Sequence, residues 1–226
     1  MIYQEMQDAI ELRYDLTMPC QVTPFVSHDH EFVRQLTGET RIPPEMLLIH
    51  EDSGNLDITL FLEQSLVDST SSVNANHHPS KEKEYDDYCT ILEGVSHFVY
   101  LVWNAQYGRQ VKPIEMELQA EVDKFVFSAL TDNDPEMNKS QPQSRPQSKH
   151  QLLFDSLFRQ VKYFHVPGTD MYHRYTVANK FAEQYCYWLS CHFQFTVSDP
   201  MLYAELARFY RMNAAAKFEH IKYSTN

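Results

Sequence analysis

The longest apolar run in the chain lies at its centre, between residues 88 and 107. It reads YCTILEGVSHFVYLVWNAQY, and its only formal charge is Glu93. Its apolar residues recur at the i, i+3, i+4, i+7 spacing of an α-helix, and the run is too long for one strand. Because a helix that is apolar on most sides must be buried on most sides, the pattern predicts a central buried helix over residues 85–107. The side chains expected in its core include Leu92, Val95, Val99 and Val102.

The pattern after this run predicts further helices. Pro113 suits the first turn of a helix that continues to about Leu130. The C-terminal third, residues 151–221, reads as a set of helices in which a Pro-Gly turn separates the first from a long second one. Asp199 and Pro200 then provide the cap and the first position of the last predicted helix.

A strand pattern occurs in the N-terminal third. Leu56 begins a segment in which apolar and polar residues alternate, and a second apolar segment precedes it across a Ser-Gly pair. Residues 46–62 are therefore expected to form a β-hairpin with one buried face. Such a hairpin is marginal alone and must pack on helices. Before it, residues 27–37 predict a short helix that Ser27 caps and Gly38 ends.

One polar stretch interrupts these elements. Residues 131–149 contain three prolines and one large apolar residue, Met137, which is typical of a flexible loop. Each half of the chain would have an incomplete core by itself, so we place this loop inside a single domain of residues 1–226. The expected fold is mainly α (α+β): a bundle of about five to six helices with a small N-terminal β-hairpin packed on it.

Composition and charge disfavour several classes of function. The 226 residues carry a net charge of −12, and the Lys and Arg residues are scattered, so neither nucleic acid nor an anionic membrane surface is an expected partner. Five glycines in the whole chain disfavour glycine-rich nucleotide loops. The four cysteines show no C-x-x-C spacing and the N-terminus has no secretory pattern. We therefore expect reduced thiols and a cytoplasmic location.

Specific catalytic motifs are absent from the sequence. The chain contains no G-x-S-x-G, Walker loop, G-x-G-x-x-G or H-E-x-x-H. Ser96 and His97 are adjacent, so on a helix they project about 100° apart and cannot act as a nucleophile and its base. This absence favours a non-enzymatic, regulatory protein that works by binding another protein or a second copy of itself, with no cofactor.

One set of polar residues supports an alternative function. Glu93 and His97 share the polar stripe of the central helix, and Glu121 and Glu183 on two other predicted helices can point towards them. Carboxylates and imidazoles from facing helices are the ligands of divalent metals in helical bundles. The alternative is therefore a metal-binding helical-bundle enzyme with Glu93, His97, Glu121 and Glu183 as ligands.

The same residues also allow a purely structural interpretation. Metal bundles use Glu-x-x-His, whereas Glu93 and His97 are four residues apart and have no second copy. A charged Glu93–His97 pair inside the bundle is the preferred interpretation. Arg174 projects to the apolar side of its helix and needs a carboxylate, for which Glu115 is a candidate. We expect Arg174, Asn179 and Glu115 to form a polar network.

Overall fold

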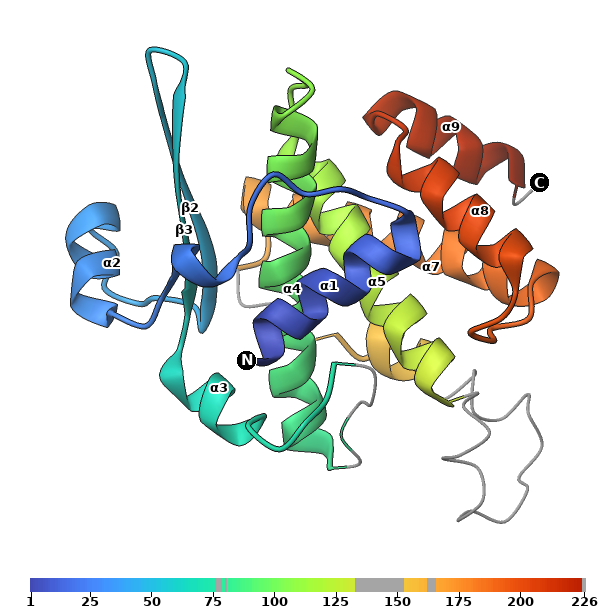
Figure 1. The fold of residues 1–226 in the computed structure, drawn as a ribbon, viewed down its shortest axis with the longest axis horizontal. Coiled ribbons are helices and arrows are strands. Elements are labelled where there is room, and N and C mark those ends of the chain that lie inside the picture. The colour runs from blue at the N-terminus through green and yellow to red at the C-terminus, as the bar shows by residue number, and fades with distance from the viewer. Residues whose placement is uncertain (76–78, 80, 133–152, 162–165, 225–226) are drawn as a thin grey trace.

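Two helices, α4 (Glu82–Ala105) and α5 (Pro113–Asp132), pack against each other at the centre of the molecule (Figure 1). The computed structural model describes residues 1–75, 79, 81–132, 153–161 and 166–224. Further helices surround this pair: α1 (Ile2–Tyr14), α7 (Asp170–His192), α8 (Pro200–Tyr210) and α9 (Ala214–Ser224). Helix α1 lies against α4 and α8, α7 packs on α5, and α9 packs on α7. The fold is mainly α with a small β part, as the sequence predicts.

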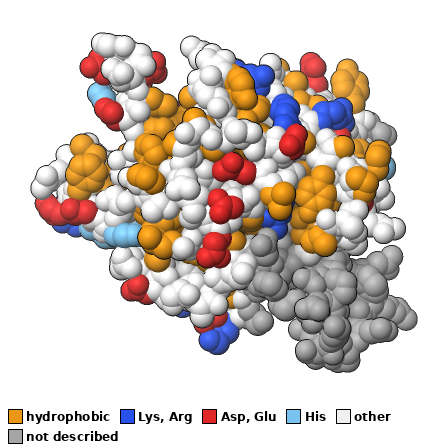
Figure 2. Space-filling model, in the orientation of Figure 1, with side chains coloured by type: hydrophobic (Ala, Val, Ile, Leu, Met, Phe, Trp, Pro, Cys, Tyr) orange, Lys and Arg blue, Asp and Glu red, His pale blue; other side chains and the backbone are white. Residues whose placement is uncertain are grey.

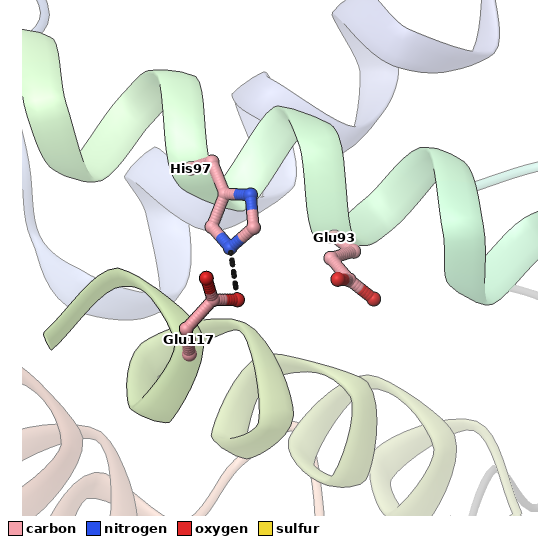
Figure 3. Close-up of side chains that lie close together, drawn as sticks. All are labelled: Glu93, His97 and Glu117. Atoms are coloured by element: carbon pink, nitrogen blue, oxygen red, sulfur yellow. Dashed lines mark ion pairs between the residues drawn. The ribbon is translucent and has the colours of Figure 1, made fainter. Parts of the chain in front are cut away.

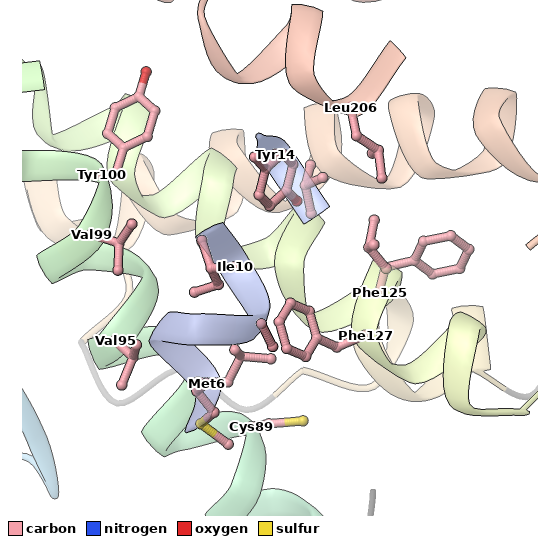
Figure 4. Close-up of a cluster of buried hydrophobic side chains, with 14 of the residues drawn as sticks. Met6, Ile10, Tyr14, Cys89, Val95, Val99, Tyr100, Phe125, Phe127 and Leu206 are labelled. Atoms are coloured by element: carbon pink, nitrogen blue, oxygen red, sulfur yellow. The ribbon is translucent and has the colours of Figure 1, made fainter. Parts of the chain in front are cut away.

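Helix α4 confirms the predicted central helix. Its expected core residues, from Leu92 to Val102, are all buried. Met6 and Ile10 of α1 and Phe127 of α5 belong to the same hydrophobic core (Figure 4). The helix is buried because its apolar positions face the sheet, α1 and α5 at once, which leaves few positions for water.

Shortening a side chain on this helix should therefore be costly. Val99 is fully buried, and Val99→Ala should lower the free energy of unfolding by about 2 kcal/mol because the surrounding side chains cannot fully close the cavity. Urea denaturation measures this loss. Val197→Ala is the control because Val197 is 71% exposed, and it should change nothing measurable. A loss below about 0.5 kcal/mol at Val99 would mean that α4 is peripheral.

The predicted hairpin is confirmed as β2 (Glu45–Asp52) and β3 (Asn55–Leu62), which are antiparallel. Ser53 and Gly54 make the turn with positive φ angles of 51° and 84°. A short strand β1 (Val26–Ser27), which the sequence pattern does not indicate, pairs in parallel with β3. Strand β3 therefore lies in the middle of this three-stranded sheet.

Only the inner half of the hairpin has a buried face. Leu60 is fully buried, whereas Leu56 is 36% exposed and Ile49 is 46% exposed. Leu56 pairs with Glu51 and Ile58 pairs with Ile49, so an apolar face continues outward past the helices. The expected buried face is therefore limited to the inner half, because the outer half of the hairpin projects beyond the body of the protein (Figure 1).

Several helix boundaries differ from the prediction. Helix α2 (His30–Thr37) is capped by Asp29, whose carboxylate accepts hydrogen bonds from the Glu31 and Phe32 amides. Ser27 lies in β1 instead, and Gly38 ends the helix as predicted. Helices α1, α3 (Gln64–Ser69) and α9 were not predicted as separate elements. The described residues consequently contain more helices than the five to six expected.

Helices α5, α7 and α8 agree with the predicted ones. Helix α5 runs on to Asp132, and the rest of the predicted loop at 131–149 lies outside the described residues. Of the first helix predicted within residues 151–221, the one before the Pro-Gly turn, the structure describes 153–161, in which Asp155–Arg159 form a π-helical turn (η3). Asp199 caps α8 as expected. In the described parts of the chain, no helix has a stretch apolar enough to span a bilayer.

Candidate functional site

Charged side chains from four elements gather beside α4 and form what we call the polar centre. Its residues are Glu45 from β2, Glu93 and His97 from α4, Glu117, Glu121 and Lys124 from α5, and Arg174 from α7. On α5 the three contributing positions are separated by four and three residues, so they share one face of that helix. Packing of α4 on α5 brings this face against Glu93 and His97.

His97 lies between two carboxylates. Its Nε2 atom is 3.3 Å from Glu117 Oε2, and its Nδ1 atom is 3.6 Å from Glu45 Oε1 (Figure 3 shows the Glu117 contact). The imidazole side chain is only 6% exposed. Neither His97 Nε2 nor Glu45 Oε1 makes an aligned hydrogen bond, although both atoms are buried. Buried polar atoms are normally satisfied, so this arrangement favours an additional partner at His97.

Three of these side chains have the arrangement of metal ligands. One ligand atom from each of Glu93, His97 and Glu117 lies within 4.8 Å of the other two. Glu93 and His97 come from α4 and Glu117 from α5, and Figure 3 shows His97 and Glu117 facing each other with the Glu93 carboxylate to one side. Around a bound transition metal, ligand atoms are about 3.4 Å apart, since each bond is about 2.1 Å long. Metal binding would require the Glu93 and Glu117 carboxylates, which are paired with Lys124 and Arg174, to move closer to His97.

Two cations already neutralise part of the charge. Lys124 Nζ lies 3.1 Å from Glu93 Oε2 and 2.7 Å from Glu121 Oε1. Arg174 Nε lies 3.3 Å from Glu117 Oε1. The polar centre has four glutamates (45, 93, 117 and 121) against these two cations, so with a neutral His97 two negative charges remain. One divalent cation would balance them.

The surroundings shift the pKa values in the direction that this charge balance requires. Burial alone lowers the pKa of His97, but Glu117 and Glu45 outweigh burial and raise that pKa well above its ordinary value of 6.5. Burial raises the pKa of the Glu45 carboxyl, against the opposing effect of His97. Burial likewise raises the pKa of Glu121 in spite of Lys124. Without a metal ion, these shifts favour a proton on His97 and oppose full ionisation of Glu45 and Glu121.

The structure brings together some of the residues proposed as metal ligands. Glu93, His97 and Glu121 all lie in the polar centre, where Glu121 is paired with Lys124. Glu183 does not join them, since its Oε1 atom lies 3.2 Å from Arg159 Nε, and the prediction of Glu183 as a ligand is wrong. Glu117 faces His97 instead, because it lies one turn before Glu121 on the same face of α5.

The expected polar network of Arg174, Asn179 and Glu115 is not formed. Arg174 pairs with Glu117, whereas Glu115 accepts a hydrogen bond from Tyr100 at 3.1 Å. Positions 115 and 117 point to nearly opposite sides of α5, since each residue turns the helix by about 100°. Asn179 donates to the Leu157 carbonyl at 3.3 Å and is separate from both.

Sequence reasoning missed the contributions of Glu45 and Lys124. Glu45 comes from a strand far from α4 in sequence. Its only distinguishing local feature is its position directly after two prolines. Lys124 was detectable, because it lies three residues after Glu121 on the same helix face, a spacing that favours ion pairs.

A second buried polar cluster lies on the opposite side of α5. Lys217 of α9 is fully buried and donates to Gln119 Oε1 at 2.7 Å. Its ammonium group lies 4.4 Å from the centre of the Tyr100 ring and 4.8 Å from that of Phe209. Burial lowers the pKa of Lys217 to about 7, although Glu115 and Asp123 oppose the shift. Here a lysine is buried with aromatic rings and an amide oxygen close to its ammonium group.

Comparison with known proteins does not assign either cluster. No protein-family model matches the chain, and neither a curated protein nor a solved structure matches it. The interpretation of the polar centre therefore depends on the geometry and charge of its own residues.

Proposed function

We propose that the protein is a cytoplasmic metal-binding protein that holds one divalent transition-metal ion at Glu93, His97 and Glu117. The observation that carries this proposal is the convergence of the three side chains within 4.8 Å in a mostly buried position. A ligand set of imidazole and carboxylates suits zinc, manganese or iron better than calcium or magnesium, which prefer oxygen ligands alone.

The charge of the polar centre supports the same proposal. A metal ion at His97 Nε2 would satisfy a buried nitrogen that lacks an aligned hydrogen bond. It would also take the place of the proton that Glu117 and Glu45 favour on His97, whose pKa they raise in the metal-free protein. Metal affinity should therefore increase with pH, because the ion must displace a proton from the imidazole.

Three protein ligands would leave an open coordination position on the ion. The Glu93 side chain is 22% exposed, against 7% for Glu117, so solvent reaches the site from the side of Glu93. A metal ion in such a position activates water, and hydrolysis is the reaction class that this arrangement supports best.

Calorimetric titration of chelator-treated protein with Zn²⁺ and Mn²⁺ tests the proposal. We expect one ion per chain, and we expect Glu117→Gln to weaken binding at least about 100-fold, since even partners outside the ligand set cost 10–100-fold. Glu115→Gln is the matched control, because it neutralises a buried carboxylate on the same helix that points away from His97. Absence of binding, or equal losses in the two variants, would refute the proposal.

A second candidate function is the binding of a protein partner by the projecting hairpin. Ile49 and Leu56 are exposed on its outer half, and hydrophobic side chains gather over the sheet and α2 in the space-filling view (Figure 2). If the partner is a second copy of the chain, Ile49→Asp should shift the protein from dimer to monomer in sedimentation equilibrium. A wild type that stays monomeric at high concentration excludes this partner.

A further inference from the structure

One residue of the polar centre comes from the sheet and not from the helices. Glu45 is the first residue of β2, and its side chain is 10% exposed. Its Oε1 atom faces His97 Nδ1, whereas Glu117 faces His97 Nε2. The two ring nitrogens of His97 therefore have different neighbours: the sheet on one side and the candidate metal ligands on the other.

Gly94 allows this close approach. A Cβ atom at position 94 would lie 2.7 Å from Glu45 Cγ and 2.9 Å from Leu60 Cδ1, closer than side chains can come. Both strands of the hairpin thus contact α4 at its one glycine. Glycine inside a helix costs about 1 kcal/mol relative to alanine, and here it makes room for the Glu45 side chain next to His97.

The contact brings a negative charge into an acidic environment. The carboxylates of Glu93 and Glu117 repel that of Glu45, and this repulsion is stronger in a poorly solvated site than in water. Lys124 and Arg174 are paired with other carboxylates of the polar centre. The group that Glu45 faces directly is the His97 ring, which is positive when it is protonated and polarised when it binds an ion. How firmly the hairpin is held should therefore depend on what is bound at His97.

We propose that Glu45 is a positioning residue that accepts a hydrogen bond from His97 Nδ1 and so leaves Nε2 free for the metal ion. Metal-bound histidines usually donate their other ring N–H to a carboxylate in this way, which fixes the tautomer and the ring orientation. In the metal-free protein Nε2 carries a proton, and a divalent ion that replaces this proton adds one positive charge beside the ring, which strengthens the attraction between His97 and Glu45. Metal occupancy then holds the base of the β-hairpin on α4. This inference rests on the metal site proposed above.

The coupling must be reciprocal. If the bound ion tightens the contact between Glu45 and His97, a change that pulls the hairpin away from α4 must weaken metal binding by the same factor. The outer half of the hairpin is exposed and its base touches His97 through Glu45, so the hairpin is the element through which metal occupancy can be sensed at the surface.

Hydrogen–deuterium exchange of the full chain with and without Zn²⁺, combined with Zn²⁺ titration, tests this inference. In the wild type, Zn²⁺ should slow amide exchange in β2 and β3. Glu45→Ala should bind Zn²⁺ about 10–100-fold more weakly and, at saturating Zn²⁺, show no slowing in the hairpin. Glu45→Gln, which keeps an acceptor oxygen, should fall between the two. Glu51→Ala changes an exposed glutamate of the same strand and should match the wild type.

The outcomes separate this inference from the function on which it rests. If the wild type binds Zn²⁺ while exchange in the hairpin does not change, or if Glu45→Ala binds Zn²⁺ as the wild type does, the role of Glu45 is refuted and the metal site stands. If the wild type binds no Zn²⁺, both are refuted. If Glu45→Ala does not fold, the comparison of Glu45→Gln with Glu51→Ala decides the question.

Discussion

Lys217→Met should make the protein more stable by about 2 kcal/mol at pH 7. Burial lowers the pKa of Lys217 from 10.5 to about 7, so in the folded state the charged amine is disfavoured. At 1.36 kcal/mol per pKa unit, this shift costs about 4 kcal/mol at pH 7. Methionine avoids that cost, but it leaves the buried Gln119 oxygen without its donor. The loss of this hydrogen bond should lower the stability by about 2 kcal/mol.

The advantage of the variant should disappear as the pH rises. Between the folded pKa and the unfolded pKa the unfolded chain binds more protons, so the wild type becomes more stable with increasing pH in the window from about 7 to 10.5. By pH 9 the wild type should have gained about 2 kcal/mol relative to the variant.

Denaturant titrations of both proteins at pH 7 and pH 9 measure this difference. Lys222→Met, on the exposed side of α9, is the control and should show no such pH dependence. A variant that is less stable than the wild type at pH 7 would mean that the contacts with Tyr100, Phe209 and Gln119 hold Lys217 as a favourable cation.

Lys124→Met should have the opposite effect and destabilise the metal-free protein by about 3 kcal/mol, because it leaves buried carboxylates without their counter-ion. Glu121 is 9% exposed, and of the two carboxylates that pair with Lys124 it is the closer one. Without Lys124 the pKa of Glu121 should rise further. More of this carboxyl is then neutral at pH 5, so the loss of stability should be smaller at pH 5 than at pH 7. Saturating Zn²⁺ should restore part of the lost stability, since the ion supplies positive charge to the same carboxylates.

Urea denaturation at the two pH values, with and without Zn²⁺, checks this prediction. Lys81→Met is the matched control, because Lys81 forms an ion pair with Glu84 on the surface, where such pairs contribute little. Equal, small effects of the two substitutions would show that the polar centre is well solvated and would argue against tight metal binding there.

The elements that the sequence predicted well are those with strong periodicity. The run from residue 88 predicted the buried helix α4, which ends at Ala105, and Asp199 with Pro200 marked the start of α8. Helix α1 was missed because its polar residues, such as Gln7 and Arg13, are buried and break the apolar pattern. Gln7 is buried because its side chain bonds to the chain around Cys20 and Val22, a contact that no local pattern reveals.

The polar centre could be predicted only in part. Glu93, His97 and Glu121 lie in the same region, as the helical wheel suggested, because α4 and α5 are neighbours in the chain and in space; their role as ligands stays a prediction. Glu45 could not be found in this way, since its position depends on how the sheet packs on α4. Glu183 was misplaced because the wheel gives the direction of a side chain along one helix and not the rotation of that helix against its neighbours.

The protonation state of the His97 ring tests the metal site most directly. Nitrogen-15 NMR reports both ring nitrogens, and the His97→Gln variant identifies the signals among those of the 11 histidines. Without metal at neutral pH, we predict a doubly protonated ring, because Glu117 and Glu45 raise its pKa. Saturating Zn²⁺ should convert it to a neutral ring with the metal on Nε2 and the proton on Nδ1. A His97 ring that stays doubly protonated at saturating Zn²⁺ would contradict the metal site.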